Sequence, residues 1–263
     1  RAFWNKTAEV DDINAFKVLM LHENKLGITW VATEEEHTDV LIGRFMPFDM
    51  SEVDRTMASL LKDNDSIGTE IQRGGQFVNI PVRQPLGVMV ADGYAAIGDS
   101  AFMTVPIIGS GIANSFKAAR ILADAVVADI DNAFSAETLW KYQTEFYKKI
   151  GSGLAPLACV KLMLTRLEGH ELDYIFRTGI LNAEDMTIGA DSTNLAAMLG
   201  GMKPADIVVK LKGLINNTVV LKKVVRMGLE LVRATAVTAA MPEKYNRKAI
   251  LKWVKEYNKC FKH

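Results

Sequence analysis

The chain has 263 residues, of which 49% are hydrophobic and 24% are charged. This balance is typical of a globular protein with one large domain or two smaller ones, and it argues against a disordered chain. Because 31 basic and 31 acidic side chains cancel, no nucleic-acid partner is expected. Two distant cysteines make no disulfide framework, and no apolar run has the length of a membrane-spanning helix, so a cytoplasmic protein is expected.

The first third of the chain predicts an antiparallel sheet with one helix. Segments rich in Val, Ile and Trp predict strands at 16–21, 27–33 and 38–45, joined by short connections. Helical spacing of apolar residues predicts a helix over 50–62, with Ser51 as its N-cap. Another extended stretch is expected over 69–82.

The pattern changes near Leu86, and the rest of the chain predicts mostly helices. Residues 88–90 and 94–97 predict a buried hairpin that ends at Gly98-Asp99, and a long helix is expected over 111–129. Further helices are predicted over 136–150, 154–167, 171–178, 193–199, 205–214, 219–239 and 247–261, with a helix break at Gly151–Gly153.

The most specific chemical signal lies between the predicted hairpin and the long helix. Asp99 follows the end of a predicted strand of small residues, and a loop then leads to Gly109-Ser110-Gly111 at the helix start. Glycines permit close backbone approach, and the free N–H groups of a helix start favour an anion or a carbonyl that gains negative charge. A carboxylate can accept hydrogen bonds from a polyol. These features together suit a flavin, which has a polyol chain and an electron-accepting ring.

The ordered motif resembles the second flavin-binding motif of FAD-dependent oxidoreductases related to geranylgeranyl reductases and aromatic hydroxylases. The residues that match are Gly98, Asp99, Pro106, Gly109, Ser110, Gly111 and Ile112. The resemblance implies that Asp99 holds the ribityl chain of FAD. It also implies that Pro106 and the segment from Gly109 to Ile112 meet the isoalloxazine ring.

Two further features resemble the geranylgeranyl-reductase branch of this superfamily. Hydroxylases usually carry an acidic residue followed by Ala where this chain has Ala118-Ala119. Residues 27–31 and 40–43 are similar to the paired strands of the family's substrate domain. The strand that contains Trp30 continues as Ala32-Thr33, where the family usually has Phe-Pro, so the substrate pocket departs from the pattern.

The first motif of the family, Gly-x-Gly-x-x-Gly after a strand, binds the ADP half of FAD. The chain lacks it, since the nearest match at 109–114 has Asn114 in place of the third glycine. We therefore expect a C-terminal part of a longer flavoprotein, whose N-terminal FAD-binding half of about 150 residues is its missing partner. FAD is expected to be absent or weakly bound in this part alone. A short natural protein that lost flavin binding is the alternative.

Other catalytic constellations are weaker. The four histidines are scattered, so no metal site is expected, and Ser110 has no evident base partner. Cys159 lies among apolar residues of a predicted helix, which favours core packing over redox chemistry. A flavoenzyme needs no protein nucleophile because the cofactor moves the hydride. The catalytic residues are therefore left unassigned.

Charge is segregated along the chain. From Lys203 to His263, fourteen Lys and Arg residues stand against four Asp and Glu, whereas the first seventy residues hold fourteen acids and seven bases. Within 219–239, basic and apolar residues follow helical spacing. Such a basic amphipathic helix can lie on an anionic membrane surface. A solvated face of a helical domain, or one neutralised by the acidic half, remains open.

The sequence thus predicts an α+β protein. An antiparallel substrate-domain sheet is expected over 1–84, a Rossmann-like segment of the FAD-binding domain over 85–132, and a helical region over 133–263. The resemblance implies a FAD-dependent oxidoreductase, with NAD(P)H or another reductant as electron donor. Its flavin would transfer hydride to a small hydrophobic substrate of the prenyl-lipid kind. Two alternatives stay open: a flavin-dependent monooxygenase of the same superfamily, and a non-catalytic helical interaction module with a decayed flavin segment.

Overall fold

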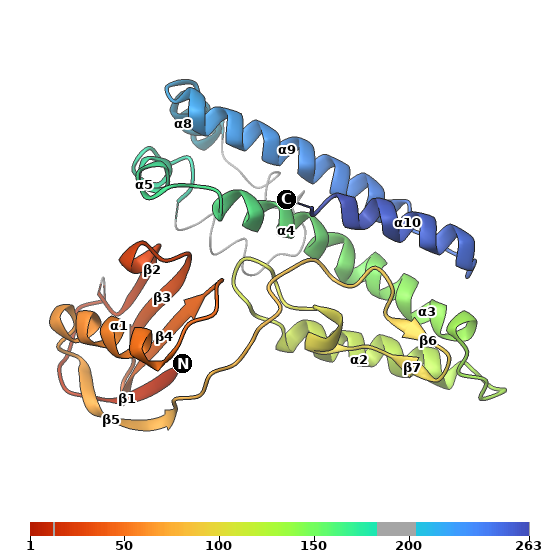
Figure 1. The fold of residues 1–263 in the computed structure, drawn as a ribbon, viewed down its shortest axis with the longest axis horizontal. Helices are drawn as coiled ribbons and strands as arrows, with labels where there is room; N and C mark the ends of the chain where they lie inside the picture. The colour runs from red at the N-terminus through yellow and green to blue at the C-terminus, as the bar shows by residue number, and fades with distance from the viewer. Residues whose placement is uncertain (13, 183–203, 263) are drawn as a thin grey trace. The chain divides into compact units, whose positions relative to one another are not determined.

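The computed structural model describes residues 1–12, 14–182 and 204–262, and it divides the chain into two compact units, Arg1–Asn79 and Ile80–His263 (Figure 1). The first unit contains an antiparallel sheet and the second is mostly helical, which confirms the predicted α+β class. The helix predicted over 193–199 lies outside the described residues.

A five-stranded antiparallel sheet forms the first unit. In order across the sheet its strands are β2 (Phe16–Met20), β3 (Gly27–Thr33), β4 (His37–Arg44), β1 (Ala2–Lys6) and β5 (Ile67–Gly74). The predicted meander of β2, β3 and β4 is confirmed. The sequence did not predict β1, which pairs with both β4 and β5 and so joins the two parts of the sheet.

One face of this sheet is covered by α1 (Met50–Asp63), which buries Leu60 against Val31, Val40 and Ile67. The predicted N-cap Ser51 is wrong, because Asp49 caps the helix. The carboxylate of Asp49 accepts hydrogen bonds from the N–H of Glu52 at 3.0 Å and from the hydroxyl of Ser51 at 2.8 Å. Those bonds lower the pKa of Asp49. Ser51 lies inside the first turn, two residues after the N-cap position.

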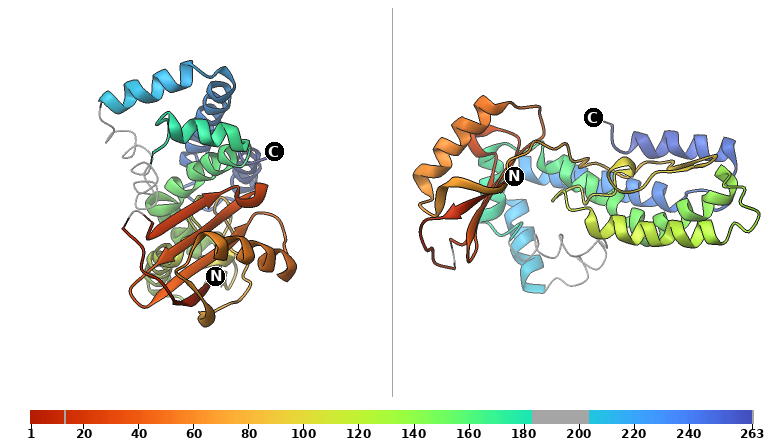
Figure 2. Two further views of the ribbon diagram at one scale, coloured as in Figure 1. Left: turned by 90° about the vertical axis from the view of Figure 1, so that its left-hand side faces the viewer. Right: turned by 90° about the horizontal axis from the view of Figure 1, so that it is seen from below.

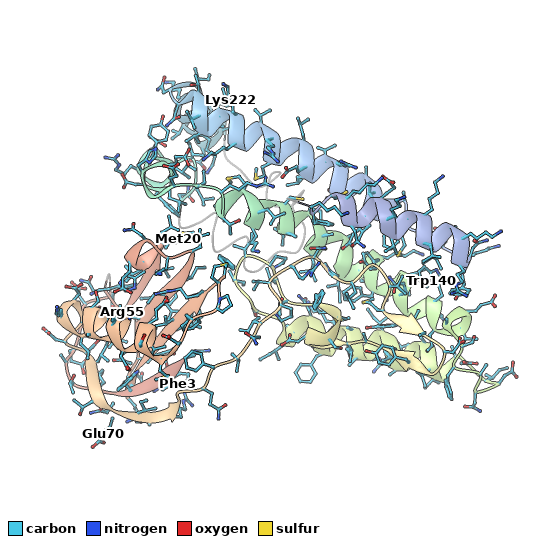
Figure 3. All side chains as sticks on the ribbon, in the orientation of Figure 1. Phe3, Met20, Arg55, Glu70, Trp140 and Lys222 are labelled. Carbon is cyan, nitrogen blue, oxygen red and sulfur yellow. The ribbon has the colours of Figure 1, made fainter. Side chains whose placement is uncertain are left out.

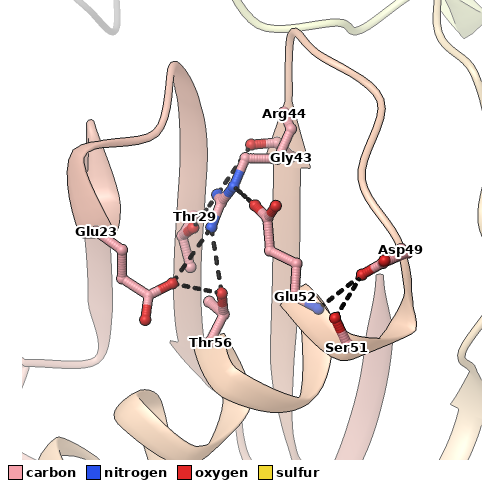
Figure 4. Close-up of polar contacts among 8 residues, drawn as sticks. All are labelled: Glu23, Thr29, Gly43, Arg44, Asp49, Ser51, Glu52 and Thr56. Carbon is pink, nitrogen blue, oxygen red and sulfur yellow. Dashed lines mark hydrogen bonds and ion pairs between the residues drawn. The ribbon is translucent and has the colours of Figure 1, made fainter.

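A buried arginine joins β4 to α1 (Figure 4). The side chain of Arg44 is 2% exposed, and it donates to Glu52 at 2.8 Å and to the hydroxyls of Thr29 and Thr56 at 3.0 and 3.3 Å. Glu23 accepts from Thr56 at 2.6 Å and lies 3.8 Å from the guanidinium. A buried charge is stable only when it is paired and hydrogen-bonded, so these contacts give Arg44 a structural role.

The second unit starts with a short hairpin and continues in helices. Its elements are β6 (Val90–Ala91), β7 (Tyr94–Ala95), η2 (Gly98–Ala101), α2 (Ile112–Val127), α3 (Ala136–Phe146), η3 (Tyr147–Gly151), α4 (Ser152–Leu164), α5 (Gly169–Arg177), α8 (Pro204–Ile215), α9 (Thr218–Ala239) and α10 (Arg247–Lys259). Figures 1 and 2 show α9 running along α4. No single described helix is long and apolar enough to cross a bilayer. One pair, Ala136–Leu164 and Gly169–Arg177, passes that test of length and composition together but is bent by 114°.

The predicted helix break at Gly151–Gly153 is wrong. The chain continues from α3 through the π-helical turn η3 directly into α4. A Cβ atom on Gly151 would lie 3.0 Å from the rings of both Phe146 and Tyr147. Gly151 therefore makes room for these two buried rings, and this packing requirement explains the glycine.

Aromatic side chains fill much of the core of the second unit. Tyr257 stacks on Trp253 with ring centroids 5.1 Å apart, and Tyr147 meets both rings edge-on. Cys159 is fully buried, and burial raises the pKa of its thiol to about 12, which confirms the predicted packing role. These contacts bring α3, η3, α4 and α10 into one hydrophobic core.

Helix side chains hold the backbone of residues 85–97. Gln143 accepts from the N–H of Met89 at 2.8 Å and donates to the carbonyl of Gly87 at 3.0 Å. Three buried tyrosine hydroxyls donate to further carbonyls of this stretch: Tyr142 to Ala96 at 2.8 Å, Tyr147 to Leu86 at 2.7 Å and Tyr257 to Pro85 at 3.0 Å. The chain just before Gly98 therefore takes its position from α3, η3 and α10.

Replacing Gln143 with Leu tests this dependence. The change leaves a buried N–H and a buried carbonyl without partners, so we expect the free energy of unfolding to fall by about 2–4 kcal/mol. Urea unfolding measures the loss, and amide hydrogen exchange at Met89 locates it. Lys141→Leu, an exposed position of α3, is the control and should change stability by about 0.5 kcal/mol or less. Equal effects of the two variants would contradict the interpretation.

An ion pair connects α5 to α9. The carboxylate of Glu171 is 4% exposed and accepts from Lys223 at 2.5 Å and from the N–H of Glu168 at 2.7 Å. Burial alone would raise the pKa of Glu171, but the hydrogen bonds from Lys223 and Glu168 outweigh it and lower the pKa overall. Lys223 also donates to the carbonyl of Arg166 at 3.0 Å, so it ties α9 to the end of α4 as well.

Glu171→Gln removes this ion pair, and the resulting loss of stability should depend on pH. Since the folded state lowers the pKa of Glu171, the stabilisation is full above the ordinary value of 4.5 and disappears as the pH falls through the lowered value. We expect the variant to be less stable than the unchanged chain by about 2 kcal/mol at neutral pH. The gap should close in acid, as measured by urea unfolding. Glu243→Gln, an exposed control, should show no such gap; a gap for Glu171→Gln that persists in acid would refute the linkage.

Candidate functional site

The turn that contains Asp99 follows the β6–β7 hairpin directly. Gly98 adopts the left-handed region at φ +65°, and the hydroxyl of Ser100 bonds both the N–H and the carbonyl of Ile97. The N–H of Phe102 donates to the carbonyl of Asp99 at 3.1 Å. The backbone of the turn is thus largely satisfied from within. The carboxylate of Asp99 is exposed and forms no hydrogen bond or ion pair with any of the described residues.

This turn lies against the first turn of α2. A Cβ atom on Gly98 would be 3.4 Å from the hydroxyl oxygen of Ser115, which itself donates to the carbonyl of Gly111 at 2.8 Å. The buried amide of Asn114 donates to the carbonyl of Met103 at 3.1 Å. The structure therefore brings the Gly98-Asp99 turn and the start of the helix together, two features that lie about a dozen residues apart in the sequence.

A closed loop connects the turn to the helix. The N–H of Val105 donates to the carbonyl of Ser110, and the N–H of Gly109 donates to the carbonyl of Val105, each at 2.8 Å. Pro106 is buried inside this loop. Gly109 is left-handed at φ +70°, a conformation that a residue with a Cβ atom adopts only at a cost.

Gly111 forms the N-cap of α2 without a capping side chain. A Cβ atom at Gly111 would lie 2.8 Å from the methyl group of Thr104, so only glycine fits here without a shift. The next residue, Ile112, is 76% exposed, and Ser110 before the cap is also exposed. The start of α2 therefore combines a positive dipole end with an open surface.

These residues fit the requirements of a flavin. An exposed carboxylate is available to accept hydrogen bonds from a polyol, and a glycine-restricted loop leads to a helix start that favours negative charge. The sequence analysis named Gly98, Asp99, Gly109 and Gly111 as candidates, and it did not name Thr104 and Asn114, which the structure places in contact with this loop. Asn114 could have been found as the one polar member of the buried stripe Asn114, Ala118, Ile121 and Ala125 on α2.

Comparisons with known proteins match this chain in part. It is 27% identical over 124 residues to a digeranylgeranylglycerophospholipid reductase of Sulfolobus acidocaldarius, a match that covers 47% of this chain and 27% of that protein. A protein of the same name from Methanothrix thermoacetophila is 28% identical over 109 residues, covering 41% of this chain and 27% of the relative. No family model matches.

The fold has a solved relative. The crystal structure of a geranylgeranyl bacteriochlorophyll reductase-like protein from Thermoplasma acidophilum superposes with a TM-score of 0.56 at 18% identity. The match covers 80% of this chain and 52% of that protein, and the matches to the two curated relatives span about a quarter of their length. Sequence and fold together confirm the predicted resemblance to the geranylgeranyl reductase-like flavoprotein superfamily.

The contact between Gly111 and Thr104 gives a test of the loop. Gly111→Ala forces the methyl group of Thr104 to move, and we expect it to lower the free energy of unfolding by about 1–3 kcal/mol. Thr104→Ser keeps the hydroxyl, which donates to the carbonyl of Pro81, but removes the methyl group. The double variant should therefore recover most of the loss in a double-mutant cycle measured by urea unfolding.

The control for this cycle is Gly228→Ala in α9. No atom lies within 4 Å of a Cβ atom at Gly228, so alanine should stabilise the helix by up to about 1 kcal/mol. If the effects of Gly111→Ala and Thr104→Ser on the free energy of unfolding simply add, the contact between these two residues does not affect stability.

Proposed function

We propose that this chain supplies the flavin-contacting segment and the substrate-domain sheet of a FAD-dependent oxidoreductase similar to geranylgeranyl reductases. The observation that carries the proposal is the exposed carboxylate of Asp99, in a turn that contacts the first turn of α2, a helix whose start has no capping side chain. The names of the matched relatives, which are reductases of prenyl compounds, point to the same chemistry.

Each part of the site has a role in this proposal. Asp99 would accept hydrogen bonds from the ribityl hydroxyls, and the backbone of Gly109, Ser110 and Gly111, with Pro106 and Ile112, would hold the ring. The dipole of α2 would stabilise negative charge that develops on the flavin. FAD, when bound, supplies the hydride.

The outer face of the sheet gives evidence for a hydrophobic substrate. On the face opposite α1, Phe16 and Val18 are 60% and 46% exposed, and the register places Val18 opposite Trp30 and Trp30 opposite Leu41. Paired residues of antiparallel strands share a face, so these side chains form an apolar patch, which lies beside the Arg1–Asp39 ion pair that contacts Trp30. It suits a prenyl chain. Bound FAD would supply hydride to one carbon of a prenyl double bond, the other carbon would take a proton from water, and NAD(P)H or another reductant would supply the two electrons.

The exposed face of α2 is evidence for contact with the proposed N-terminal half of the protein. Ile112, Phe116 and Val127 are 76%, 73% and 81% exposed, although the opposite face of the helix is buried in the core. A helix that is apolar on both faces is typical of a buried position. The matched relatives are longer than the matched region, and a dinucleotide-binding half that holds the ADP part of FAD would cover this face.

The test uses the polypeptide encoded by the complete natural reading frame, with and without Asp99→Ala. After reconstitution with FAD, the unchanged protein should show a bound-flavin spectrum. With NAD(P)H or a chemical reductant supplied, it should add two hydrogens to each reduced double bond of a geranylgeranyl lipid, as detected by mass spectrometry. Loss of the charge-assisted hydrogen bonds should weaken FAD binding by about 10–100-fold. Asp131→Ala, an exposed control, should bind FAD as the unchanged protein does.

Two results would overturn the proposal in different ways. An unchanged protein that takes up no flavin would be a helical interaction module. A flavin-bound protein that consumes oxygen and NAD(P)H without reducing prenyl double bonds would be a monooxygenase.

A further inference from the structure

We propose that the outer face of α9 docks on the surface of an anionic lipid bilayer. The face is defined by Val225, Leu229 and Val232, which are 53%, 69% and 66% exposed and recur at helical spacing. The opposite side of the same helix buries Val220, Ala234 and Thr238. Because α9 already buries one stripe in the protein, its second apolar stripe is free for another partner.

Basic side chains flank this stripe along one edge. Lys222, Arg226 and Arg233 are exposed and lie within about a quarter turn of the apolar residues on a helix of 3.6 residues per turn. Figure 3 labels Lys222 on the side of α9 that faces away from α4. Arg226 forms an ion pair with Glu230 at 2.9 Å, whereas Lys222 and Arg233 are exposed and form no ion pair with any described residue.

The preceding helix also exposes apolar side chains. α8 exposes five aliphatic residues, Ile207, Val208, Val209, Leu211 and Ile215, at 41–67%. Only Asn216 and Asn217 separate the two helices, and the side chain of Asn217 caps α9. Lys212 is exposed near the end of α8. Two consecutive helices thus combine exposed aliphatic residues with Lys or Arg.

Charge complementarity selects the partner. An apolar stripe flanked by Lys and Arg is the pattern of a helix that lies in the interface of a bilayer, where the cations meet anionic headgroups and the apolar residues enter the acyl boundary. A second copy of the chain would place Lys222 and Arg233 against the same cations, which disfavours a dimer through this face. The proposal does not depend on the flavin. If the proposed function holds as well, docking brings the enzyme to the membrane, where prenyl lipids are located.

The experiment is co-sedimentation of the 263-residue chain with sucrose-loaded vesicles of phosphatidylglycerol and phosphatidylcholine, compared with phosphatidylcholine alone. The unchanged chain should bind the anionic vesicles, more weakly as the salt concentration rises, and should leave neutral vesicles largely unbound. Lys222→Glu/Arg233→Glu should weaken binding by about 25-fold or more, since each charge near the surface is worth about fivefold. Lys62→Glu/Lys117→Glu changes the net charge equally at exposed positions outside α8 and α9 and should weaken binding less than about twofold.

A second pair of variants tests the apolar stripe. Leu229→Ser should weaken binding to the anionic vesicles, whereas Val127→Ser, an 81% exposed residue of α2, should not. Circular dichroism confirms that each variant is folded before it is compared. The proposal is wrong if the unchanged chain does not sediment with anionic vesicles or binds neutral ones equally well. It is also wrong if the two double variants behave alike, or if Leu229→Ser dissociates an oligomer in sedimentation velocity.

Discussion

The backbone of residues 85–97 must find hydrogen-bond partners inside a helical unit, and the rest of the site depends on how it does so. Its own hairpin pairs Val90 with Ala95 and Ala91 with Tyr94, and it adds one bond from the N–H of Ala96 to the carbonyl of Met89 at 2.7 Å. Gln143 and the hydroxyls of buried tyrosines supply further partners from α3, η3 and α10. A buried backbone group without a partner costs about 1–3 kcal/mol, so these helices cannot move without disturbing the stretch that leads into Gly98. The position of Asp99 is therefore set by residues that lie more than forty positions further along the chain.

This arrangement explains what the sequence could and could not predict. Local features could be recognised in the sequence. A long helix was predicted where α2 lies, and Gly98, Gly109 and Gly111 indicated a tight turn and a helix start. Long-range constraints could not be recognised in it. β1 has no pattern that distinguishes it until it pairs with β4 and β5, and Gly151 resembles a helix break until the rings of Phe146 and Tyr147 occupy the space beside it. Gln143 likewise has no visible role until the carbonyl of Gly87 lies within reach.

The second unit exposes apolar side chains on two helices, and the charges beside them indicate different partners. On α2 the exposed Arg120 is paired with Asp124 at 3.3 Å, which leaves Lys117 as the one charge unpaired with any described residue on the helix that carries Ile112, Phe116 and Val127. An apolar face with so little net charge suits another packed protein layer. On α9 the stripe lies in a segment where basic residues greatly outnumber acidic ones, which suits an anionic lipid surface. Exposed apolar side chains can therefore indicate either a protein partner or a lipid surface. The charges beside them favour a protein partner for α2 and a lipid surface for α9.

Backbone strain supports a functional role for the Asp99 turn independently of any cofactor. Phe102 adopts the left-handed conformation at φ 57° and ψ 50°, which is rare for a bulky residue and costs roughly 1–2 kcal/mol. Its N–H bonds the carbonyls of Gly98 and Asp99, and the guanidinium of Arg83 lies 4.9 Å from the centre of its ring. Such strain persists only where surrounding contacts compensate for it, and it is concentrated at functional sites. Here the compensating contacts come from the protein itself, through Arg83, Asn114 and Ser115. The turn therefore fixes the backbone of Asp99 from within the protein, whereas its exposed carboxylate has no partner among the described residues and is available to a ligand.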